Sequence, residues 1–275
     1  MKYLLMAFGL VALLAPLAVS KDTPAAKVLF NGKDLTGWDT WLGKPEKGTS
    51  GVDLSKPLGL NNDPLGVYSV VETDGKPAIR VSGQAFGAIT SKEEFENYHL
   101  KFEIKWGEKR WPPREKAVRD SGLLYHCVGP HGAGSGFWMK SFESQIQEND
   151  FGDFYGVAGV IVDVEGERKS PKSAIVFKKG GETFKGVTDR IVRNPLSEKK
   201  LGEWNTVELY CYGQTSVHVN NGKVNMVMTN LRHKVQDKEV PLTKGKIQLQ
   251  SEGAEVFFRN IEVRPLEKMP EELLK

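Results

Sequence analysis

The chain has 275 residues, of which 39% are hydrophobic and 27% are charged, so it can bury a large core and extensive disorder is excluded. The 38 basic residues outnumber the 35 acidic ones by a net charge of only +3, without long Lys/Arg blocks, which argues against a general binder of nucleic acid or anionic membranes. Two cysteines exclude a disulfide-dense scaffold and a four-cysteine zinc site.

The first twenty residues have the composition of a secretory signal peptide. Lys2 supplies the positive start, residues 3–19 are apolar and uncharged, and residues 18–20 (AVS) are the small residues that signal peptidase reads. The alternative is a retained membrane anchor, for which so short a segment interrupted by Pro16 is marginal. We expect cleavage after Ser20, export to the periplasm or the extracellular space, and no stable membrane span after cleavage.

Short segments of alternating polarity dominate the chain from residue 78 onward. The clearest is 98–106 (YHLKFEIKW), which places apolar residues on one face and Lys101, Glu103 and Lys105 on the other. The turn residues at 220–222 (NNG) predict a β-hairpin. Further strands are predicted at 78–82, 121–128, 142–148, 160–164, 206–211, 217–219, 224–228, 245–250 and 255–264.

These strands follow one another at hairpin spacing, without the alternating helices of a parallel α/β fold. The pattern predicts an all-β protein, an antiparallel sandwich or barrel. Strand density is continuous and no linker divides it. We therefore expect a signal peptide at 1–20 and a single domain at 21–275, with its core at 27–266.

The segment FESQIQEND at 142–150 is the most informative for function. On a strand, Glu143, Gln145 and Gln147 share one face, where three long polar side chains can bind several sugar hydroxyls at once. The alternative is an ordinary solvated face. Glu and Gln are poor strand formers, and the aromatic and Gly-rich flanking loops favour a site.

The same face supplies only one carboxylate. Ordinary glycosidases need two carboxylates around the scissile bond, and Glu148 and Asp150 lie past the strand or on another face. The pattern therefore favours a one-base reaction or pure sugar binding over standard hydrolysis.

Other strands offer further candidate side chains. His126 is the histidine of the strand at 121–128 and could be a base near neutral pH, although a structural histidine is the plain alternative. Lys105 could stabilise an oxyanion, or belong with Glu103 to a cross-strand charge ladder. Trp111, in the loop WGEKRWPPREK, could stack on a sugar ring or pack in the core.

The C-terminal strands add Gln250, Glu252 and Arg259 as possible substrate contacts, each otherwise a surface residue. Cys127 and Cys211 fall on apolar strand faces, which predicts buried thiols or one disulfide. The sequence requires no cofactor. A divalent metal remains open, because Glu143, His126 and Asp150 could approach in space, but no spacing demands one.

Several segments together resemble one exported family, the domain of unknown function 1080 family, also called the 3-keto-disaccharide hydrolase family. The resemblance spans essentially the whole mature chain, and the first and last segments are the most specific. It rests on LFNGKDLTGW at 29–38, EFENYHLKFEIKW at 94–106, DSGLLYH at 120–126, ESQIQEND at 143–150, GEWNTVEL at 202–209 and LQSEGAEVFFRNIEVRPL at 249–266.

The resemblance implies a concanavalin A-like jelly-roll sandwich that acts on sugars already oxidised at C3 by a partner oxidoreductase. A C3 ketone acidifies the C2 proton, so a single base could start elimination at C1, after which water adds back. Within that chemistry, we expect Glu143 or His126 as the base and Lys105 beside the enolate. Many relatives carry a His where this chain has Glu252, which puts the role of that position in doubt.

Two other functions fit the same features. One is a non-catalytic carbohydrate-binding sandwich, since the long loops at 40–66 and 107–120 suit it equally well. The other is a conventional glycoside hydrolase with Glu143 and a distant acid. We expect an oligosaccharide or a 3-keto-glycoside as the partner, and no nucleic acid.

Overall fold

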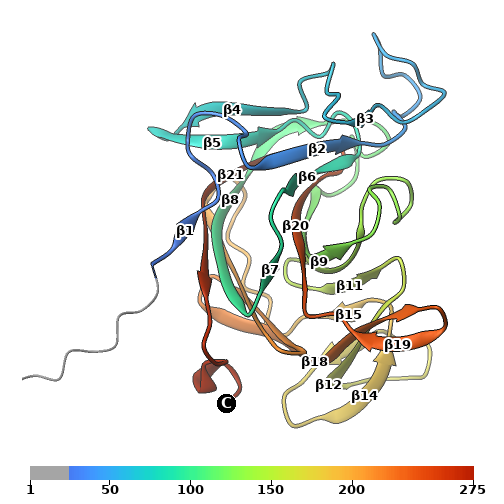
Figure 1. Ribbon diagram of the computed structural model, residues 1–275, viewed down its shortest axis with the longest axis vertical. Helices are drawn as coiled ribbons and strands as arrows, with labels where there is room; N and C mark the ends of the chain where they lie inside the picture. The colour runs from blue at the N-terminus through green and yellow to red at the C-terminus, as the bar shows by residue number, and fades with distance from the viewer. Residues whose placement is uncertain (1–24) are drawn as a thin grey trace, which may run out of the picture.

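The predicted strands pair antiparallel and form two layers that face each other across the core (Figure 1). The computed structural model describes residues 25–275, so the predicted signal peptide lies outside the described residues. In spatial order, the first layer contains β3 (Gly59–Leu60), β2 (Trp38–Leu42), β6 (Gly87–Ser91), β20 (Lys244–Ser251), β9 (Asp120–Val128), β10 (Lys140–Gln147) and β11 (Phe154–Val157). The short β7 (Phe95–Glu96) pairs with the start of β20.

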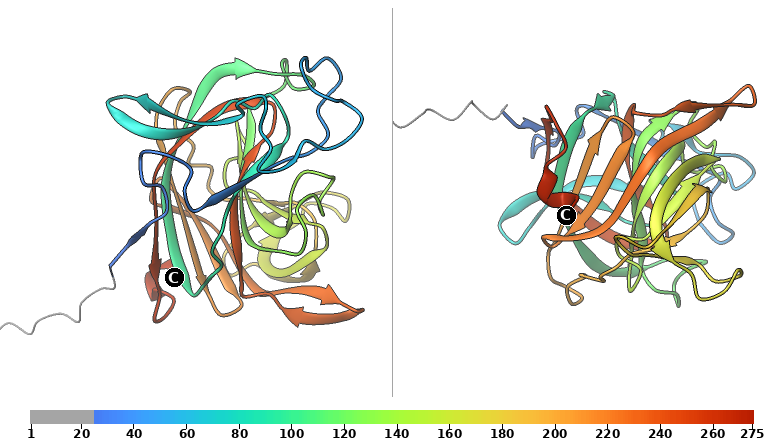
Figure 2. Two further views of the ribbon diagram at one scale, coloured as in Figure 1. Left: turned by 45° about the horizontal axis from the view of Figure 1, so that its top comes forward. Right: turned by 90° about the horizontal axis from the view of Figure 1, so that it is seen from below.

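The second layer has more strands than the first. Figure 2 shows both layers from two further directions. The second layer contains β4 (Tyr68–Thr73), β5 (Lys76–Val81), β21 (Ala254–Pro265), β8 (Tyr98–Arg110), β16 (Asn205–Tyr212), β17 (Thr215–Asn220), β18 (Lys223–Val235), β12 (Val160–Glu167) and β14 (Glu182–Val187). Two further strands belong to this layer: β1 (Lys27–Val28) pairs with the later part of β21, and β19 (Lys238–Pro241) pairs with the end of β18.

Two short strands join the layers along one side. β13 (Ile175–Phe177) pairs with β12, and β15 (Ile191–Val192) pairs with β11 and, in parallel, with β13. The described part of the chain contains one short 3-10 helix, Glu271–Leu273, and no helix there has the length and apolar character needed to cross a membrane. The prediction of an all-β, concanavalin A-like jelly-roll sandwich is confirmed.

Side-chain alternation builds the core between the layers. In β8, Leu100, Phe102 and Ile104 are fully buried while the intervening charged residues face outward, as the sequence predicts. In the facing layer, Tyr125 of β9 and Phe142 of β10 are equally buried. Each such side chain contributes roughly 1.5–3 kcal/mol through burial. The core therefore holds the two layers together, and the side chains on the outer face of each layer are free to form a binding or catalytic site.

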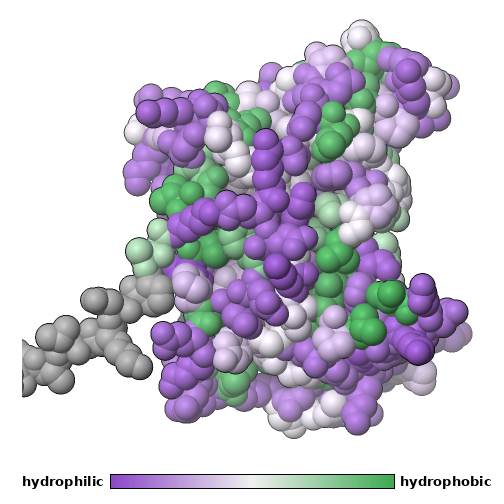
Figure 3. Space-filling view, viewed as in Figure 1, coloured by the Kyte–Doolittle hydropathy of each residue, from purple (hydrophilic) through white to green (hydrophobic). Residues whose placement is uncertain are grey.

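The predicted hairpin at 220–222 is confirmed between β17 and β18. Asn221 has φ +50° and Gly222 φ +74°, the left-handed values that a tight two-residue hairpin turn requires. Elsewhere on the surface, the face in Figure 3 is mostly hydrophilic, with hydrophobic side chains in separate patches.

A β-bulge in β9 changes the face to which its last residues point. Lys140 pairs with Val128, yet Phe142 pairs with Tyr125, so β9 has one residue more than β10 between these pairs. The extra residue lies at His126, which has φ +49°. A bulge of this kind reverses the alternation beyond it, and this reversal decides the positions of His126 and Cys127.

Both cysteines are buried and free, which confirms their predicted burial. Cys211 lies on the core face of β16, as expected. Strict alternation along β9 predicts that Cys127 shares the face of Leu123 and Tyr125, and this is wrong. Because of the bulge, it packs with Leu124 in a small cluster on the other side of the layer.

Candidate active site

The outer face of the first layer carries a cluster of polar side chains over β10, β9 and β20. Glu143 of β10 lies opposite Leu124 of β9, and Gln145 lies opposite Gly122, so the alternation predicted for β10 is correct. A Cβ atom at Gly122 would overlap the Oε1 atoms of both Glu143 and Gln250. The two side chains therefore meet in the space that the glycine leaves free.

Glu143 occupies the centre of this cluster and is nearly inaccessible, with 6% of its surface exposed. Burial and, to a smaller extent, the negative charge of Asp120 raise the pKa of its carboxyl group to about 8, although the neighbouring Gln250 amide lowers it. A carboxyl group with such a pKa exchanges its proton near neutral pH, as a general acid or base requires.

A second carboxyl group, Asp120, stands at the start of β9 on the same face. It is buried, and burial raises its pKa to about 7, although the adjacent Arg114 guanidinium lowers it. Arg114 Nη2 lies 2.6 Å from Asp120 Oδ2. The second oxygen, Asp120 Oδ1, is buried without a hydrogen-bond partner.

Glu252 is the third carboxyl group of the cluster. It follows β20, and its Oε1 atom lies 3.7 Å from Arg114 Nη1. Burial, Asp120 and Glu143 raise the pKa of Glu252 well above its ordinary value, and Arg114 lowers it. The expectation that this face holds a single carboxylate is therefore wrong, because tertiary structure brings Asp120 and Glu252 to Glu143.

The amides of β10 hold the surroundings in place. Gln147 Oε1 accepts a hydrogen bond from Arg114 Nη2 at 2.8 Å, and its Nε2 atom donates to Asp150 Oδ2 at 2.8 Å. Gln145 Oε1 accepts from the Ile146 backbone N–H at 3.0 Å. Gln145 and Gln147 thus lie where the sequence predicts, but in the structure their side chains contact protein groups.

Tyr155 completes the face from β11. It is the register partner of Glu143 across the β10–β11 pair. Burial raises the pKa of its phenol to about 12, so the group is a neutral hydrogen-bond donor near neutral pH. Arg190 stacks over the ring at 5.8 Å and forms an ion pair with Asp150 at 2.9 Å.

His126 does not join the cluster, and its predicted position beside Glu143 is wrong. The bulge turns its ring into the core, where it packs edge-on against Tyr98, Tyr125 and Phe142 and is 0% exposed. Its Nδ1 atom is paired with the Leu242 carbonyl at 3.1 Å. Burial lowers its pKa to about 4, so this histidine is neutral at ordinary pH.

Lys105 also lies away from Glu143. It projects from the outer face of β8, in the second layer, so the core separates it from the cluster. Its Nζ atom pairs with Asp74 at 2.6 Å and lies 5.1 Å from the centre of the Trp204 ring. Matched alternation in the strands at 98–106, 121–128 and 142–148 predicts that their polar faces line one concave surface, and this prediction is wrong because β8 lies in the other layer.

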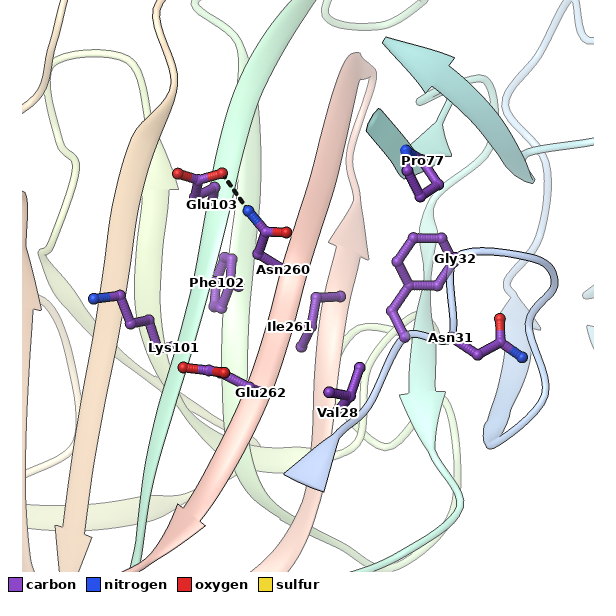
Figure 4. Close-up of a pocket in the computed structure, with 11 residues that line it drawn as sticks. Val28, Asn31, Gly32, Pro77, Lys101, Phe102, Glu103, Asn260, Ile261 and Glu262 are labelled. Atoms are coloured by element: carbon purple, nitrogen blue, oxygen red, sulfur yellow. Dashed lines mark hydrogen bonds between the residues drawn. The ribbon is translucent and has the colours of Figure 1, made fainter. Parts of the chain in front are cut away.

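Glu103 and Arg259 belong to the same outer face of the second layer. Arg259 Nε donates to Glu103 Oε2 at 2.6 Å, and Asn260 Nδ2 donates to the same oxygen at 2.7 Å. Figure 4 shows Glu103 and Asn260 in a surface cavity of about 400 Å³ that Lys101 and Glu262 also line. Neither Glu103 nor Arg259 lies with Glu143, so the structure divides the predicted site residues between two surfaces.

Trp111 lies in the loop that carries Arg114. Its indole N–H donates to the Ser82 carbonyl at 3.0 Å, and its backbone N–H donates to the Gly253 carbonyl at 2.8 Å. In the described residues, no three His, Cys, Asp or Glu side chains are grouped as metal ligands would be. The trio of Glu143, His126 and Asp150 in particular is not brought together, because His126 faces the core.

Sequence reasoning missed Asp120 and Arg114. Asp120 could have been found, because the alternation of β9 places it two residues from Gly122 on the same face. Arg114 could not, since it comes from a loop at 111–119 without periodicity, and its position depends on how that loop folds over β20.

Several solved structures and one family model are similar to this chain. Two crystal structures of candidate glycosyl hydrolases from Parabacteroides distasonis are 18% and 21% identical to this chain, with TM-scores of 0.48 and 0.49. Each alignment covers 88% of this chain, and the two alignments cover 94% and 100% of the other chains. A carbohydrate-binding module from Bacillus subtilis is 10% identical over 72% of this chain and 91% of its own, with a TM-score of 0.41. No curated protein matches the chain. A family model described as a 3-keto-alpha-glucoside-1,2-lyase-like domain matches residues 25–264, and the chain therefore belongs to this carbohydrate-active family.

Proposed function

We propose that the protein cleaves the glycosidic bond of 3-keto-glycosides, with the carboxyl groups of Asp120 and Glu143 as the acid–base pair. One observation carries the proposal. Asp120 and Glu143 lie on one face of the first layer, on the neighbouring strands β9 and β10, and their pKa values are raised to about 7 and about 8. Groups that titrate this close to neutrality can both take and give a proton during turnover.

The reaction begins at C2 of the oxidised sugar. One carboxylate takes the C2 proton, and the C–H electron pair forms an enolate whose charge rests on the C3 oxygen. The enolate then expels the C1 substituent, the C1=C2 double bond forms and the C3 ketone returns. The second carboxyl group gives its proton to the departing glycosidic oxygen, and water can later add across the double bond.

The polar groups of the cluster suit an uncharged sugar. Gln250 Oε1 and Asp120 Oδ1 are buried acceptors without partners, and each can accept a hydrogen bond from a sugar hydroxyl. Arg114 and Arg190 are already engaged by Asp120 and Asp150, which leaves little cationic charge for an acidic sugar. The family match supports a carbohydrate substrate. A C3-oxidising oxidoreductase would have to act upstream, because the reaction needs the ketone.

A second candidate function is conventional glycoside hydrolysis. The observation in its favour is the presence of Asp120 and Glu252 beside Glu143, since two carboxyl groups on one face are what acid and nucleophile or base require. This reaction would need no oxidised substrate and would leave the C2 proton in place.

Paired substrates distinguish the two reactions. We expect product from a 3-keto-disaccharide and none from the unoxidised disaccharide, and a rate decrease when C2 carries deuterium. Product from the unoxidised sugar, without a C2 isotope effect, would favour conventional hydrolysis instead. If calorimetry detects binding of either sugar but no product forms, the protein is a non-catalytic carbohydrate-binding sandwich.

Substitutions locate the reaction. Glu143→Gln and Asp120→Asn preserve size and remove the proton exchange, so each should lower turnover by about 10²- to 10⁴-fold with little change in binding. Glu103→Gln is the matched control, because this carboxyl group lies on the outer face of the other layer. If both Glu143→Gln and Asp120→Asn keep full activity, the cluster is not the active site.

A further inference from the structure

We propose that Arg114 is a positioning residue that decides which carboxyl group of the cluster is ionised, so that Asp120 is the base and Glu143 the proton donor. This inference rests on the proposed function for its chemical meaning, and it differs from the sequence expectation that either Glu143 or His126 is the base. It rests on the geometry of one guanidinium group among three carboxyl groups.

The guanidinium of Arg114 is bound from three elements. Nη2 pairs with Asp120 of β9 at 2.6 Å and donates to Gln147 Oε1 of β10 at 2.8 Å. Nη1 lies 3.7 Å from Glu252, in the turn between β20 and β21. Nη2 also approaches the Val118 carbonyl at 3.5 Å, while Nε is buried without a partner.

The loop that carries Arg114 is itself tied to the sandwich. The Arg114 backbone N–H donates to the Trp111 carbonyl at 2.8 Å, and Ala117 donates to the Arg114 carbonyl at 3.0 Å. Trp111 in turn binds Gly253 and Ser82. The guanidinium is therefore held in place before any substrate arrives, which is what preorganised electrostatics require.

One positive charge cannot balance three buried negative charges. A buried carboxylate without a partner takes up a proton rather than stay ionised. Among the described residues, Asp120 has the close contact with the guanidinium, Glu252 has the longer one, and Glu143 has no ion pair. Asp120 is therefore the carboxylate, and Glu143 keeps its proton beside Gln250.

Other charged side chains near Asp120 do not change the order in which Asp120 and Glu143 ionise. Asp150 reaches Arg114 only through the Gln147 amide, and it is engaged by Arg190 at 2.9 Å. Its charge acts on Asp120 in the direction of protonation, and Arg114 opposes it. Removing Arg114 should therefore move the proton of the cluster onto Asp120 and disable the base.

Infrared titration of the carboxyl C=O bands tests the ionisation order without any substrate. In the unsubstituted protein, the band that Asp120→Asn removes should titrate at lower pH than the band that Glu143→Gln removes. If the Glu143 band titrates first, the proposal is overturned. This result stands whether or not a 3-keto-glycoside is cleaved, so its failure is separable from failure of the proposed function.

Substitution of the arginine tests the cause. Arg114→Gln should raise the titration midpoint of the Asp120 band by about 1 to 3 pH units, and Arg114→Lys should raise it less. Arg110→Gln is the control, because Arg110 binds the Ala117 carbonyl in the same loop without touching a carboxyl group. An unchanged Asp120 midpoint in folded Arg114→Gln would overturn the proposal. If that variant does not fold, Arg114→Lys and the band order in the unsubstituted protein still decide it.

A leaving-group comparison tests the two roles. With nitrophenol as the aglycone of a 3-keto-glucoside, departure needs no proton, so Glu143→Gln should recover most of its lost activity. Asp120→Asn should stay inactive on both substrates, because C2 proton removal is still required. Recovery of Asp120→Asn with no recovery of Glu143→Gln would reverse the assignment.

Discussion

Glu143 Oε1 occupies the space directly above Gly122, where any side chain would have its Cβ atom. The glycine is therefore part of how β9 admits the carboxyl group of β10. Gln250 reaches the same space from β20, so three neighbouring strands meet at one point. The same arrangement makes Gly122 a direct test of the site.

Gly122→Ala should abolish turnover while the fold survives. The added methyl group would displace the carboxyl group of Glu143 and the amide of Gln250. A displacement of about 1 Å at reacting groups can cost about 10²-fold in rate, so we expect at least that loss in kcat. The measurement is the initial rate on a 3-keto-disaccharide, with circular dichroism to confirm the fold.

Gly134→Ala is the control for this steric change. Its added methyl group would press on the Val157 side chain, and Gly134 lies in the loop between β9 and β10 rather than under Glu143. It should alter stability without the loss of rate. Equal rate losses in both variants would show that general strain, not displacement of Glu143, is responsible.

The pH dependence of kcat/KM should be a narrow bell. The base must be ionised, so the rate rises as pH passes the pKa of Asp120, which is about 7. The acid must be protonated, so the rate falls as pH passes the pKa of Glu143, which is about 8. Because the two groups interact, the limbs report the pair together. If kcat/KM stays constant over about five pH units around the two pKa values, these groups are not the acid and base of the reaction.

His126→Asn should weaken the fold and leave the chemistry alone. The substitution removes ring packing against Tyr98, Tyr125 and Phe142, at a cost of about 1–3 kcal/mol in the free energy of unfolding. Asn tolerates the left-handed backbone of this position. We expect kcat to change less than about threefold, within the usual effect of a remote change. A loss of kcat of a hundredfold (about 3 kcal/mol) would return His126 to the active site.

His126 should also make the folded protein less stable as the pH falls. Burial lowers the folded-state pKa of His126 from 6.5 to about 4. Its stabilising contribution is therefore complete above pH 6.5 and is lost as pH falls from 6.5 through about 4. The carboxyl groups with raised pKa values, such as Glu143, act in the opposite sense, since their contribution is lost as pH rises.

The difference between two proteins isolates this effect. Urea unfolding at neutral and mildly acidic pH should show a larger acid-induced loss for the unsubstituted protein than for His126→Asn. An identical acid-induced loss in both would show that folding does not lower the pKa of His126.

Lys105→Ala should leave turnover within about twofold of the original value, in line with the small effects of substitutions away from a site. The ammonium group is separated from Glu143 by the core and is paired with Asp74 on the far face of the second layer. Asp74→Ala is the matched control for loss of the ion pair. A turnover decrease specific to Lys105→Ala would mean that the second layer takes part in the reaction.

Local alternation was sufficient to predict the fold class. In β8 and β10, apolar and polar residues alternate with the period of a strand, so the sequence alone determined that Phe102 and Phe142 enter the core and that Glu143, Gln145 and Gln147 leave it. The hairpin at 220–222 was equally determined by its turn residues. These features depend on neighbours in the chain, and sequence records neighbours directly.

The layer to which each strand belongs was decided only by the tertiary structure. The charged face of β8 has the same pattern as that of β10, yet β8 pairs with β16 and β21 in the other layer, so Lys105, Glu103 and Arg259 lie away from Glu143. Strand order depends on long-range packing of apolar faces, and any alternating strand fits either layer by its own pattern.

The composition of the site depended on two features that no periodicity reveals. The bulge at His126 turns that side chain into the core, because a single extra residue reverses every later face of β9. The loop at 111–119 brings Arg114 to Asp120, because its contacts with Gly253 and Ser82 hold it over the end of β20. The sequence by itself determined that Glu143 faces out of the sandwich; the tertiary structure decided which charged groups meet it there.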